Sequence, residues 1–204
     1  MKRATTSDQV NERKKEIIDA VSKMFDTIDY QDISMKTISE HISIARSSLY
    51  CYYKSKEEIM LDILKEDYLL FLSELTNAIK NKNNIVKNTT DIYLKHLKLL
   101  KIISVYLTDI ENHCSLDSLV NFKASFVKPF DILHETFIAS YPETPIDTIE
   151  TIISSLLILT HGLYPMIYPN DNQVKAMQKV KMNYCNNPYK YCYDYLNLIF
   201  FNLL

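Results

Sequence analysis

Apolar residues recur at the spacing of an α-helix along almost the whole chain. In residues 9–28 they form one stripe, made by Val10, Ile17, Val21, Met24, Phe25 and Ile28. The same spacing predicts two short helices in 34–52, a long helix from Lys56 to about Ile79, and further helices over 85–103, on to Asn112, and over 116–140, 146–164, 171–183 and 189–204. No stretch alternates between apolar and polar residues as a half-buried strand does, so the pattern predicts an all-α fold.

Capping signals mark the starts of two of these helices. Ser55-Lys56-Glu57-Glu58 has the form of a capping box, in which the serine accepts a hydrogen bond from the amide of Glu58 and the glutamate reaches back. Thr144-Pro145 places a capping residue before a proline in the first turn of the next helix. We expect these residues of the long helix after Ser55 to be buried: Ile59, Ile63, Leu64, Leu70, Phe71 and Leu75.

Residues 34–52 fit a helix-turn-helix. Ser34 would cap the first short helix, Ile38 and Ile42 would face its core, and Ser43 would lie at the turn. The stretch "SIARSSLYCYYKSKEEI" begins at this turn and is dense in hydrogen-bonding groups. Such groups are unfavourable in an apolar core, so this stretch indicates a binding partner outside the chain.

The second helix of this motif, predicted from Ala45 to Cys51, has chemistry that suits DNA. Leu49 would face the core and leave Arg46, Ser47, Ser48 and Tyr50 exposed. A guanidinium can bind guanine through two hydrogen bonds in the major groove, so we expect Arg46 to read bases. Hydroxyl groups and lysines suit phosphate oxygens, which position a protein without reading sequence. We expect these residues to hold phosphates or flank the readout: Ser34, Lys36, Ser47, Ser48, Tyr50, Tyr52 and Lys56.

A charged surface between two helices would explain any one of these features alone. The helix-turn-helix spacing, the capping box and the pair Tyr50 and Lys56 occur together, and this combination favours DNA binding.

Residues 17–60 resemble the DNA-binding domain of the tetracycline-repressor (TetR) family of transcriptional regulators. "IIDAVSKMF" is similar to the end of the family's first helix, and "YQDISMKTISEHISIARSSLYCYYKSKEEI" follows its "y..ts...iA...gvs.gtlY.yF.sKe.L" pattern. These residues fall in register: Ile38, Ile44, Ser48, Leu49, Tyr50, Tyr53, Ser55, Lys56, Glu57 and Ile59. The resemblance covers about a quarter of the chain and implies a second helical domain that varies with its ligand.

Three positions depart from the family pattern. Asp29 and Ser43 stand where the family usually has glycine, and Ser39 stands where it usually has alanine. A left-handed turn favours glycine because a Cβ atom is crowded there. We therefore expect backbone strain at Asp29 and Ser43, with less at the aspartate.

These features predict an N-terminal helix-turn-helix domain, residues 1–54, and a C-terminal ligand-sensing and dimerisation domain, residues 55–204. The resemblance implies that helices of the second domain wrap around a small-molecule pocket. Ligand sites are mainly apolar and aromatic, so a few aromatic residues would line it while most are core. The candidates, with two histidines that could instead be hydrogen-bonded core residues, are Tyr68, Phe71, Tyr93, Tyr106, Phe122, Phe126, Phe130, His134, His161 and Tyr164.

The last helix, "YKYCYDYLNLIFFNLL", is apolar nearly all round and must be covered on more than one side. A helix on a membrane surface would need basic residues on one face, and only Lys190 is present, so a homodimer interface is the better account. The most apolar run, 152–168, is interrupted by polar residues and Pro165. It predicts a buried helix and not a membrane span.

Composition narrows the function further. The net charge is −2, yet residues 1–56 hold ten Lys or Arg against eight Asp or Glu, and all three arginines, Arg3, Arg13 and Arg46, lie there. The single glycine excludes a Walker loop and a dinucleotide fingerprint, which need two or more. The sequence shows no nucleophile–base pair, and His113-Cys114 has no partner pair at metal-ligand spacing. We therefore expect no enzyme, cofactor or metal site.

The first residues, "MKRATTSDQVNERKKE", are polar and carry no secretory signal. We expect a reducing cytoplasm, in which the four cysteines stay as free thiols.

The sequence is best interpreted as a transcriptional regulator that binds a palindromic DNA operator as a homodimer. It would repress transcription until a small-molecule effector lowers its affinity. The alternative is a constitutive DNA-binding protein without a ligand, whose second domain would have no cavity.

Overall fold

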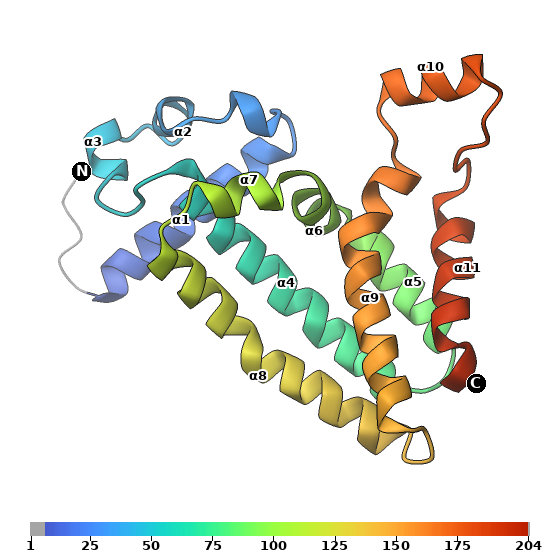
Figure 1. Cartoon of the computed structure of the whole chain (residues 1–204). Helices are drawn as coiled ribbons and strands as arrows, with labels where there is room; N and C mark the ends of the chain where they lie inside the picture. The colour runs from blue at the N-terminus through green and yellow to red at the C-terminus, as the bar shows by residue number, and fades with distance from the viewer. Residues whose placement is uncertain (1–6, 204) are drawn as a thin grey trace. The chain divides into compact units, whose positions relative to one another are not determined.

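The computed structural model describes residues 7–203, apart from the side chain of Asn202, so Arg3 lies outside the described residues. The described part is helical almost throughout and contains no β-strand, which confirms the all-α prediction (Figure 1). In chain order the elements are α1 (Ser7–Phe25), η1 (Tyr30–Asp32), α2 (Met35–His41), α3 (Arg46–Leu49), α4 (Lys56–Lys80), α5 (Ile85–Lys95), α6 (Leu97–Lys101), η2 (Ile102–Tyr106), α7 (Leu107–Asn112), α8 (Leu116–Ser140), α9 (Ile146–Ile167), α10 (Asp171–Lys179), α11 (Pro188–Phe200) and η3 (Phe201–Leu203).

The chain forms two compact units. Unit 1 takes the residues up to Glu66 together with Thr108–Ala124, and unit 2 takes Asp67–Leu107 together with Ser125–Leu204. Both α4 and α8 pass from one unit to the other. Unit 1 therefore joins α7 and the start of α8 to the helix-turn-helix, although these segments lie far from it in the sequence.

The helix-turn-helix is built on the apolar stripe of α1. Ile17 and Val21 are fully buried, as are Ile38 of α2 and Leu49 of α3. α2 packs against both α1 and α3. Each short helix thus has one fully buried residue. Burial of this residue sets the rotation of the helix, so that its opposite side faces solvent.

The turn between α2 and α3 has the strained conformation expected at Ser43. Its φ of 52° lies in the left-handed region, where a serine Cβ is crowded. The same expectation is wrong for Asp29, whose φ of −62° and ψ of 141° are extended. Asp29 precedes η1 without a left-handed turn, so no glycine is needed there.

Some element boundaries differ from the prediction. α3 ends at Leu49, and residues 50–52 form a turn in place of the predicted helix to Cys51. The single helix expected over 85–103 is broken at His96, where φ is −98° and ψ is 34°, and continues into the π-helix η2. Before α9 the cap position belongs to Pro145, which makes no side-chain capping bond, so the expected Thr144 cap is absent.

The start of α4 confirms half of the predicted capping box. The amide of Glu58 donates to Ser55 Oγ at 3.3 Å. The Glu58 carboxylate accepts from the amide of Lys54 at 2.8 Å, one residue before the one expected. Further along α4, Leu70 is 52% exposed and not buried, because it lies one turn from Glu66 and Ser73 on the solvent side.

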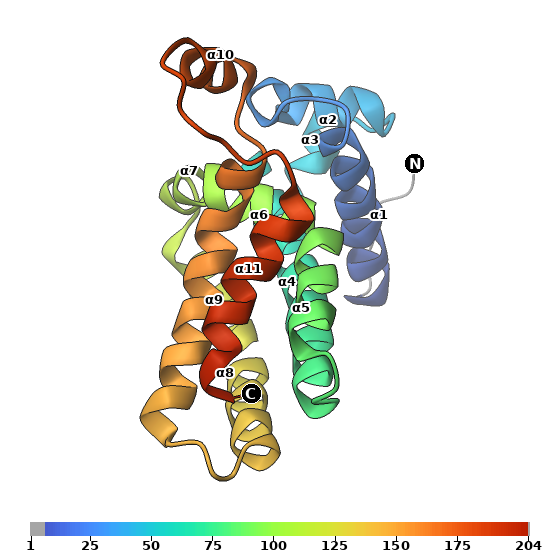
Figure 2. The same ribbon diagram turned by 90° about the vertical axis from the view of Figure 1, so that its right-hand side faces the viewer.

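Unit 2 is a helical bundle in which α5, α9 and α11 lie side by side (Figure 2). α9 also packs against α6 and η2. By length and composition α9 could cross a membrane. Leu156 and Leu163 pack inside the bundle against the neighbouring helices. Only 28% of its most apolar stretch is buried, however, and Ile158 is 72% exposed, so the prediction of a buried helix is wrong for its outer face.

Candidate nucleic-acid interface

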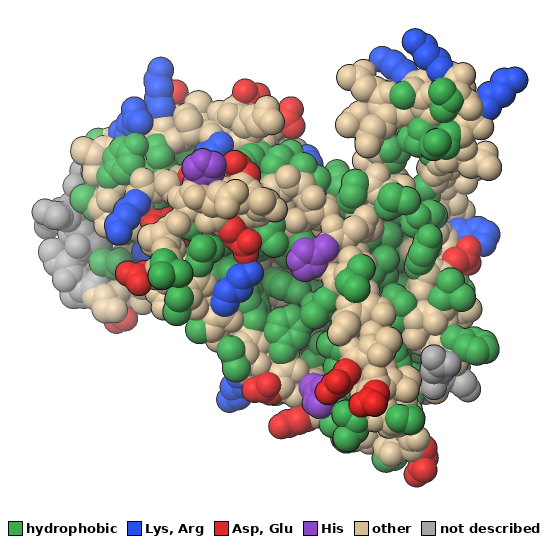
Figure 3. All heavy atoms as spheres, viewed as in Figure 1, with side chains coloured by type: hydrophobic (Ala, Val, Ile, Leu, Met, Phe, Trp, Pro, Cys, Tyr) green, Lys and Arg blue, Asp and Glu red, His purple; other side chains and the backbone are tan. Residues whose placement is uncertain are grey.

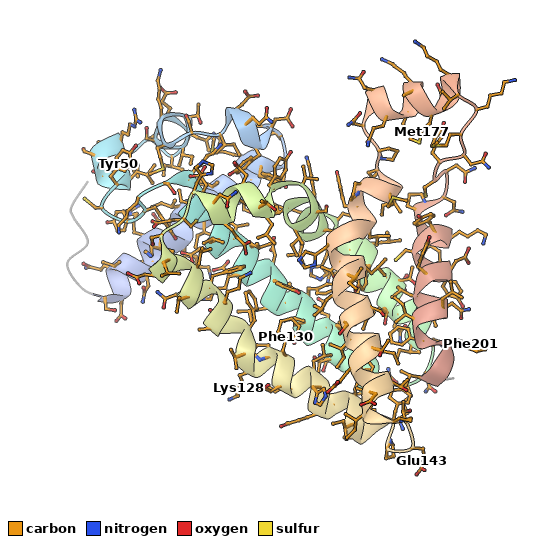
Figure 4. All side chains as sticks on the ribbon, viewed as in Figure 1. Tyr50, Lys128, Phe130, Glu143, Met177 and Phe201 are labelled. Carbon is orange, nitrogen blue, oxygen red and sulfur yellow. The ribbon has the colours of Figure 1, made fainter. Side chains whose placement is uncertain are left out.

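The structure gathers four predicted DNA-binding residues on the exposed side of α3. Arg46, Ser47, Ser48 and Tyr50 are all exposed, whereas Leu49 between them is fully buried. Figure 4 labels Tyr50 at the outer side of this short helix. The burial of Leu49 anchors the helix so that its polar side chains face outward.

Arg46 is oriented by its neighbour one turn along. Its Nη2 donates a hydrogen bond to the Tyr50 hydroxyl at 3.1 Å, and the guanidinium carbon lies 5.6 Å from the centre of the Tyr50 ring. A guanidinium has five N–H donors, so this bond leaves enough of them for a two-bond contact with a base.

Ser34 and Lys36 lie at the start of α2. The amide of Thr37 donates to Ser34 Oγ at 3.2 Å, and the amide of Ser34 donates to Thr37 Oγ1 at 2.9 Å, which forms a complete capping box. The Ser34 hydroxyl therefore has a structural partner already. Lys36 has a 71% exposed side chain, 3.9 Å from Glu40, and its ammonium is accessible to an anion.

The Lys56 side chain contacts Tyr30 inside unit 1, a contact that the sequence did not predict. Its Nζ donates to the backbone carbonyl of Tyr30 at 2.9 Å and lies 4.1 Å from the centre of the Tyr30 ring. An ammonium has three donors, so the contact leaves others for a phosphate. Glu57 and Glu58 in the same turn place negative charge at the positive end of α4, which reduces its attraction for phosphate. Tyr52 is half-buried beside this segment of the chain.

Two buried tyrosines with acidic partners were not singled out as site residues by the sequence. The Tyr30 hydroxyl donates to Asp109 Oδ2 at 3.1 Å and lies 3.4 Å from Glu57 Oε1, and the Tyr53 hydroxyl donates to Asp62 at 2.8 Å. Burial first, and the nearby carboxylates second, raise the pKa of both tyrosines well above its usual value. Both therefore stay neutral hydrogen-bond donors. Tyr30 and Asp109 are 79 residues apart, and no local pattern links them.

In unit 2 the structure brings five of the ligand-pocket candidates into one aromatic cluster. Tyr68 packs against Phe126 with ring centres 5.0 Å apart and also meets Phe71 and Phe130, while Phe71 packs edge-on against Tyr93 at 5.1 Å. Tyr68, Phe71, Tyr93 and Phe126 are at most 8% exposed. The cluster is the apolar, aromatic environment that a small molecule would need, and its members pack closely on one another.

The other candidates lie elsewhere. Tyr106, His134 and Tyr164 are half-buried, and His161 is exposed with its Nδ1 donating to the Leu157 carbonyl at 2.8 Å. Phe122 belongs to unit 1. There it lines a small cavity of about 150 Å³ together with Lys14, Tyr53 and Asp62.

A polar group beside the aromatic cluster was missed by the sequence reasoning. His96 is 8% exposed, packs edge-on against Phe71 at 5.5 Å, and donates from Nε2 to Glu74 at 3.0 Å. Lys95 also bonds Glu74, and this bond is the main cause that lowers the pKa of the Glu74 carboxyl. His96 stands at the break between α5 and α6, which the helical spacing did not reveal.

A larger cavity, of about 540 Å³, lies in unit 2 where the end of α9, α10 and the start of α11 meet. Its walls include Met166, Met177 and Met182, with Tyr191 and several asparagines. Figure 4 labels Met177 on α10. None of the predicted pocket residues lines this cavity.

Comparison with known proteins identifies the architecture. Residues 17–63 match the family described as bacterial regulatory proteins of the tetR family, and residues 66–193 match the tetracyclin repressor-like C-terminal domain. The fatty acid metabolism regulator protein of Bacillus subtilis (strain 168) is 27% identical over 85 residues, which span 42% of this chain and 44% of that relative. Proteins of this family are DNA-binding regulators and not enzymes, in agreement with the function class predicted from the sequence. The chain is therefore a member of the TetR family of transcriptional regulators.

Proposed function

We propose that the protein is a repressor that binds a palindromic operator as a homodimer and is released by a small molecule. The exposed side of α3 carries this proposal, since Arg46 is held by Tyr50 and flanked by Ser47 and Ser48. In this arrangement Arg46 reads bases, while the hydroxyl groups and Lys36 hold phosphates. Lys56 adds a phosphate contact from the start of α4, and Tyr52 flanks the readout.

Exposed apolar side chains of unit 2 support a homodimer. On α9, Ile158 is 72% exposed, and on the C-terminal segment Leu198 and Phe201 are 70% and 72% exposed. Figure 3 shows hydrophobic side chains at the surface on either side of α9. Exposed large apolar side chains gather where proteins associate, and a two-fold dimer would cover those of α9 and of the C-terminal segment.

The effector is an apolar or aromatic molecule bound in unit 2. The aromatic cluster around Phe71, with the polar pair His96 and Glu74 at its edge, supports this class. The partial relative is named as a regulator of fatty acid metabolism, which is compatible with an apolar effector. Such a repressor acts in the cytoplasm, where its operator lies.

A constitutive DNA-binding protein is the second candidate, and one observation favours it. Phe71 and Tyr93 are 1% and 0% exposed and pack on each other, so a ligand between them would have to displace side chains. Under this alternative the cluster is only the core of unit 2, and DNA affinity is independent of metabolites.

Selection from a random DNA library, followed by sequencing, tests the first part of the proposal. We expect an enriched motif of two inverted half-sites whose centres lie about 34–36 Å apart, one turn of DNA. Recovery of DNA without any sequence preference would overturn operator binding.

The ligand response needs a separate test with the selected duplex. A panel of apolar and aromatic compounds is screened for thermal stabilisation of the protein, and each hit is titrated by calorimetry with and without the duplex. Binding linkage requires DNA to weaken ligand binding by the same factor by which the ligand weakens DNA binding. Equal ligand affinities in both titrations would leave the constitutive alternative standing.

A further inference from the structure

The residue Tyr30 joins three parts of unit 1 that are distant in sequence. Its hydroxyl donates to Asp109 of α7 at 3.1 Å and lies 3.4 Å from Glu57 of α4. Its backbone carbonyl accepts from Lys56 Nζ at 2.9 Å, and the same ammonium lies over its ring. Tyr30 is only 3% exposed, so the side chain is fixed by packing as well as by hydrogen bonds.

The position of Tyr30 makes these bonds relevant to the DNA-binding surface. Tyr30 opens η1, which is followed after two residues by α2. Thr37 Oγ1, in the capping box of α2, donates to the Ser34 carbonyl at 3.1 Å and also lies 3.5 Å from the carbonyl of Asp32 in η1. Tyr30 is therefore placed, through the short backbone link after η1, to influence the first turn of α2, which packs against α3.

The partner Asp109 lies on a segment that is suited to move. α7 has only six residues and continues from the π-helix η2 without a break. π-helical segments are uncommon and occur frequently at functional sites. The Asp109 side chain is 53% exposed, and its other oxygen lies 3.3 Å from His113 on the same helical face.

We propose that Tyr30 and Asp109 form a side-chain link that transmits displacement of α7 to the helix-turn-helix without passing through α4. The hydroxyl has one hydrogen, and two carboxylates lie within reach of it, so the link can pass from Asp109 to Glu57 when α7 moves. In the first arrangement the Tyr30 hydroxyl ties η1 to α7, and in the second it ties η1 to α4, to which the Tyr30 carbonyl is bonded through Lys56 in both. Use of this link by an effector rests on the proposed ligand response, whereas the link itself does not.

Amide hydrogen exchange on the full chain tests the link without ligand or operator. The variants are Tyr30→Phe, which keeps the ring and the carbonyl, Asp109→Ala, and the double variant. Tyr30→Phe removes the bonds to both carboxylates and should speed exchange of the α2 and α3 amides about fivefold, the factor that corresponds to one ordinary hydrogen bond. Asp109→Ala leaves Glu57 as an acceptor for the hydroxyl and should speed exchange less. The double variant should exchange no faster than Tyr30→Phe, because without the hydroxyl Asp109 has no bond to lose.

Tyr53→Phe provides a matched control. Tyr53 is equally buried and donates to an aspartate, Asp62, but this bond does not involve α7. Combined with Asp109→Ala it should give effects that multiply. Asp109→Asn, whose amide oxygen can still accept from Tyr30, should stay close to the unsubstituted protein.

Two results would overturn the proposal. In the first, Asp109→Ala speeds exchange in α7 while α2 and α3 keep their original rates. In the second, Asp109→Ala has the same effect in the Tyr30→Phe background as in the unsubstituted protein. Either result leaves operator binding and ligand response untouched, because neither enters the measurement.

Discussion

The hydroxyl of Tyr93 on α5 donates a hydrogen bond of 2.7 Å to the backbone carbonyl of Leu156, in the middle of α9. The same carbonyl accepts from Thr160 Oγ1 at 2.8 Å, and all three residues are buried. Tyr93 thus fastens two helices of unit 2 together. The Tyr93 hydroxyl therefore already has a hydrogen-bond acceptor within the protein.

Tyr93→Phe should therefore lower the free energy of unfolding by about 1–2 kcal/mol, since one buried hydrogen bond is lost while the Leu156 carbonyl keeps a partner. Urea denaturation followed by circular dichroism measures this. Tyr189→Phe, at an exposed position on α11, is the control and should change little. Unchanged stability together with a lost effector response would instead identify Tyr93 as a ligand contact.

Arg46→Ala should remove base discrimination. We expect a loss of about 1–3 kcal/mol on the selected operator and little change on scrambled DNA. Filter-binding titrations on the operator and on the scrambled duplex measure the two affinities separately. Tyr50→Phe should give a smaller loss in the same direction, because the guanidinium loses the hydroxyl that orients it. An operator preference that survives Arg46→Ala would show that other residues read the bases.

Lys56→Ala should weaken matched and scrambled DNA similarly and flatten the salt dependence by about one counterion. It should also lower the thermal midpoint of the free protein, because its ammonium bonds the Tyr30 carbonyl. Lys36→Ala is the control for stability alone: as a second proposed phosphate contact it should also weaken DNA binding, but it should leave the thermal midpoint unchanged because its side chain is exposed. A lower midpoint with unchanged DNA affinity would assign Lys56 a purely structural role.

Ser43→Gly should stabilise the protein by about 1 kcal/mol, because glycine adopts the left-handed φ of 52° without a crowded Cβ. Asp29→Gly should destabilise it, since φ at Asp29 is −62° and glycine there only adds freedom to the unfolded chain. Chemical denaturation of both variants checks the contrast. Equal shifts in one direction would show that backbone conformation is not the cause.

Replacing Leu198 or Ile158 by aspartate should dissociate the homodimer or cause aggregation, because each places a charge in the exposed apolar surface of unit 2. Asn197→Asp adds the same charge to α11 at an exposed polar position and should remain dimeric. Sedimentation velocity at micromolar concentration measures the oligomeric state of each variant. A compact monomer that still binds operator tightly would contradict the dimer proposal.

Glu74 should contribute a pH-dependent part of the stability. Its pKa is lowered in the folded protein, chiefly by the bond from Lys95, so this contribution is complete above the unfolded pKa of about 4.3 and is lost as pH falls through the folded pKa. Glu74→Gln should therefore be less stable than the parent at neutral pH, and the difference should shrink in acid. Glu150→Gln, at an exposed position of α9, is the matched control for the loss of one carboxylate.

The helix-turn-helix could be predicted from the sequence because its determinants are local. Residues three and four apart share one face of a helix, so the spacing of apolar residues predicts that Ile38 and Leu49 are buried. Ser34 and Ser55 cap helices through amides only three residues away. Arg46 and Tyr50 are one turn apart, so their common side of α3 followed from spacing alone.

Other features were decided by the tertiary structure, because their causes lie far away in the chain. Leu70 fits the apolar pattern of α4 and is nevertheless exposed, since no segment of the described chain covers that side. Spacing alone also did not show the break at His96, whose ring packs on Phe71 of α4 and bonds Glu74. The bond from Lys56 to the Tyr30 carbonyl was likewise not predicted, since the two residues are 26 positions apart. The bond between Tyr30 and Asp109 spans 79 residues, and only the packing of α7 against the rest of unit 1 brings those two side chains together.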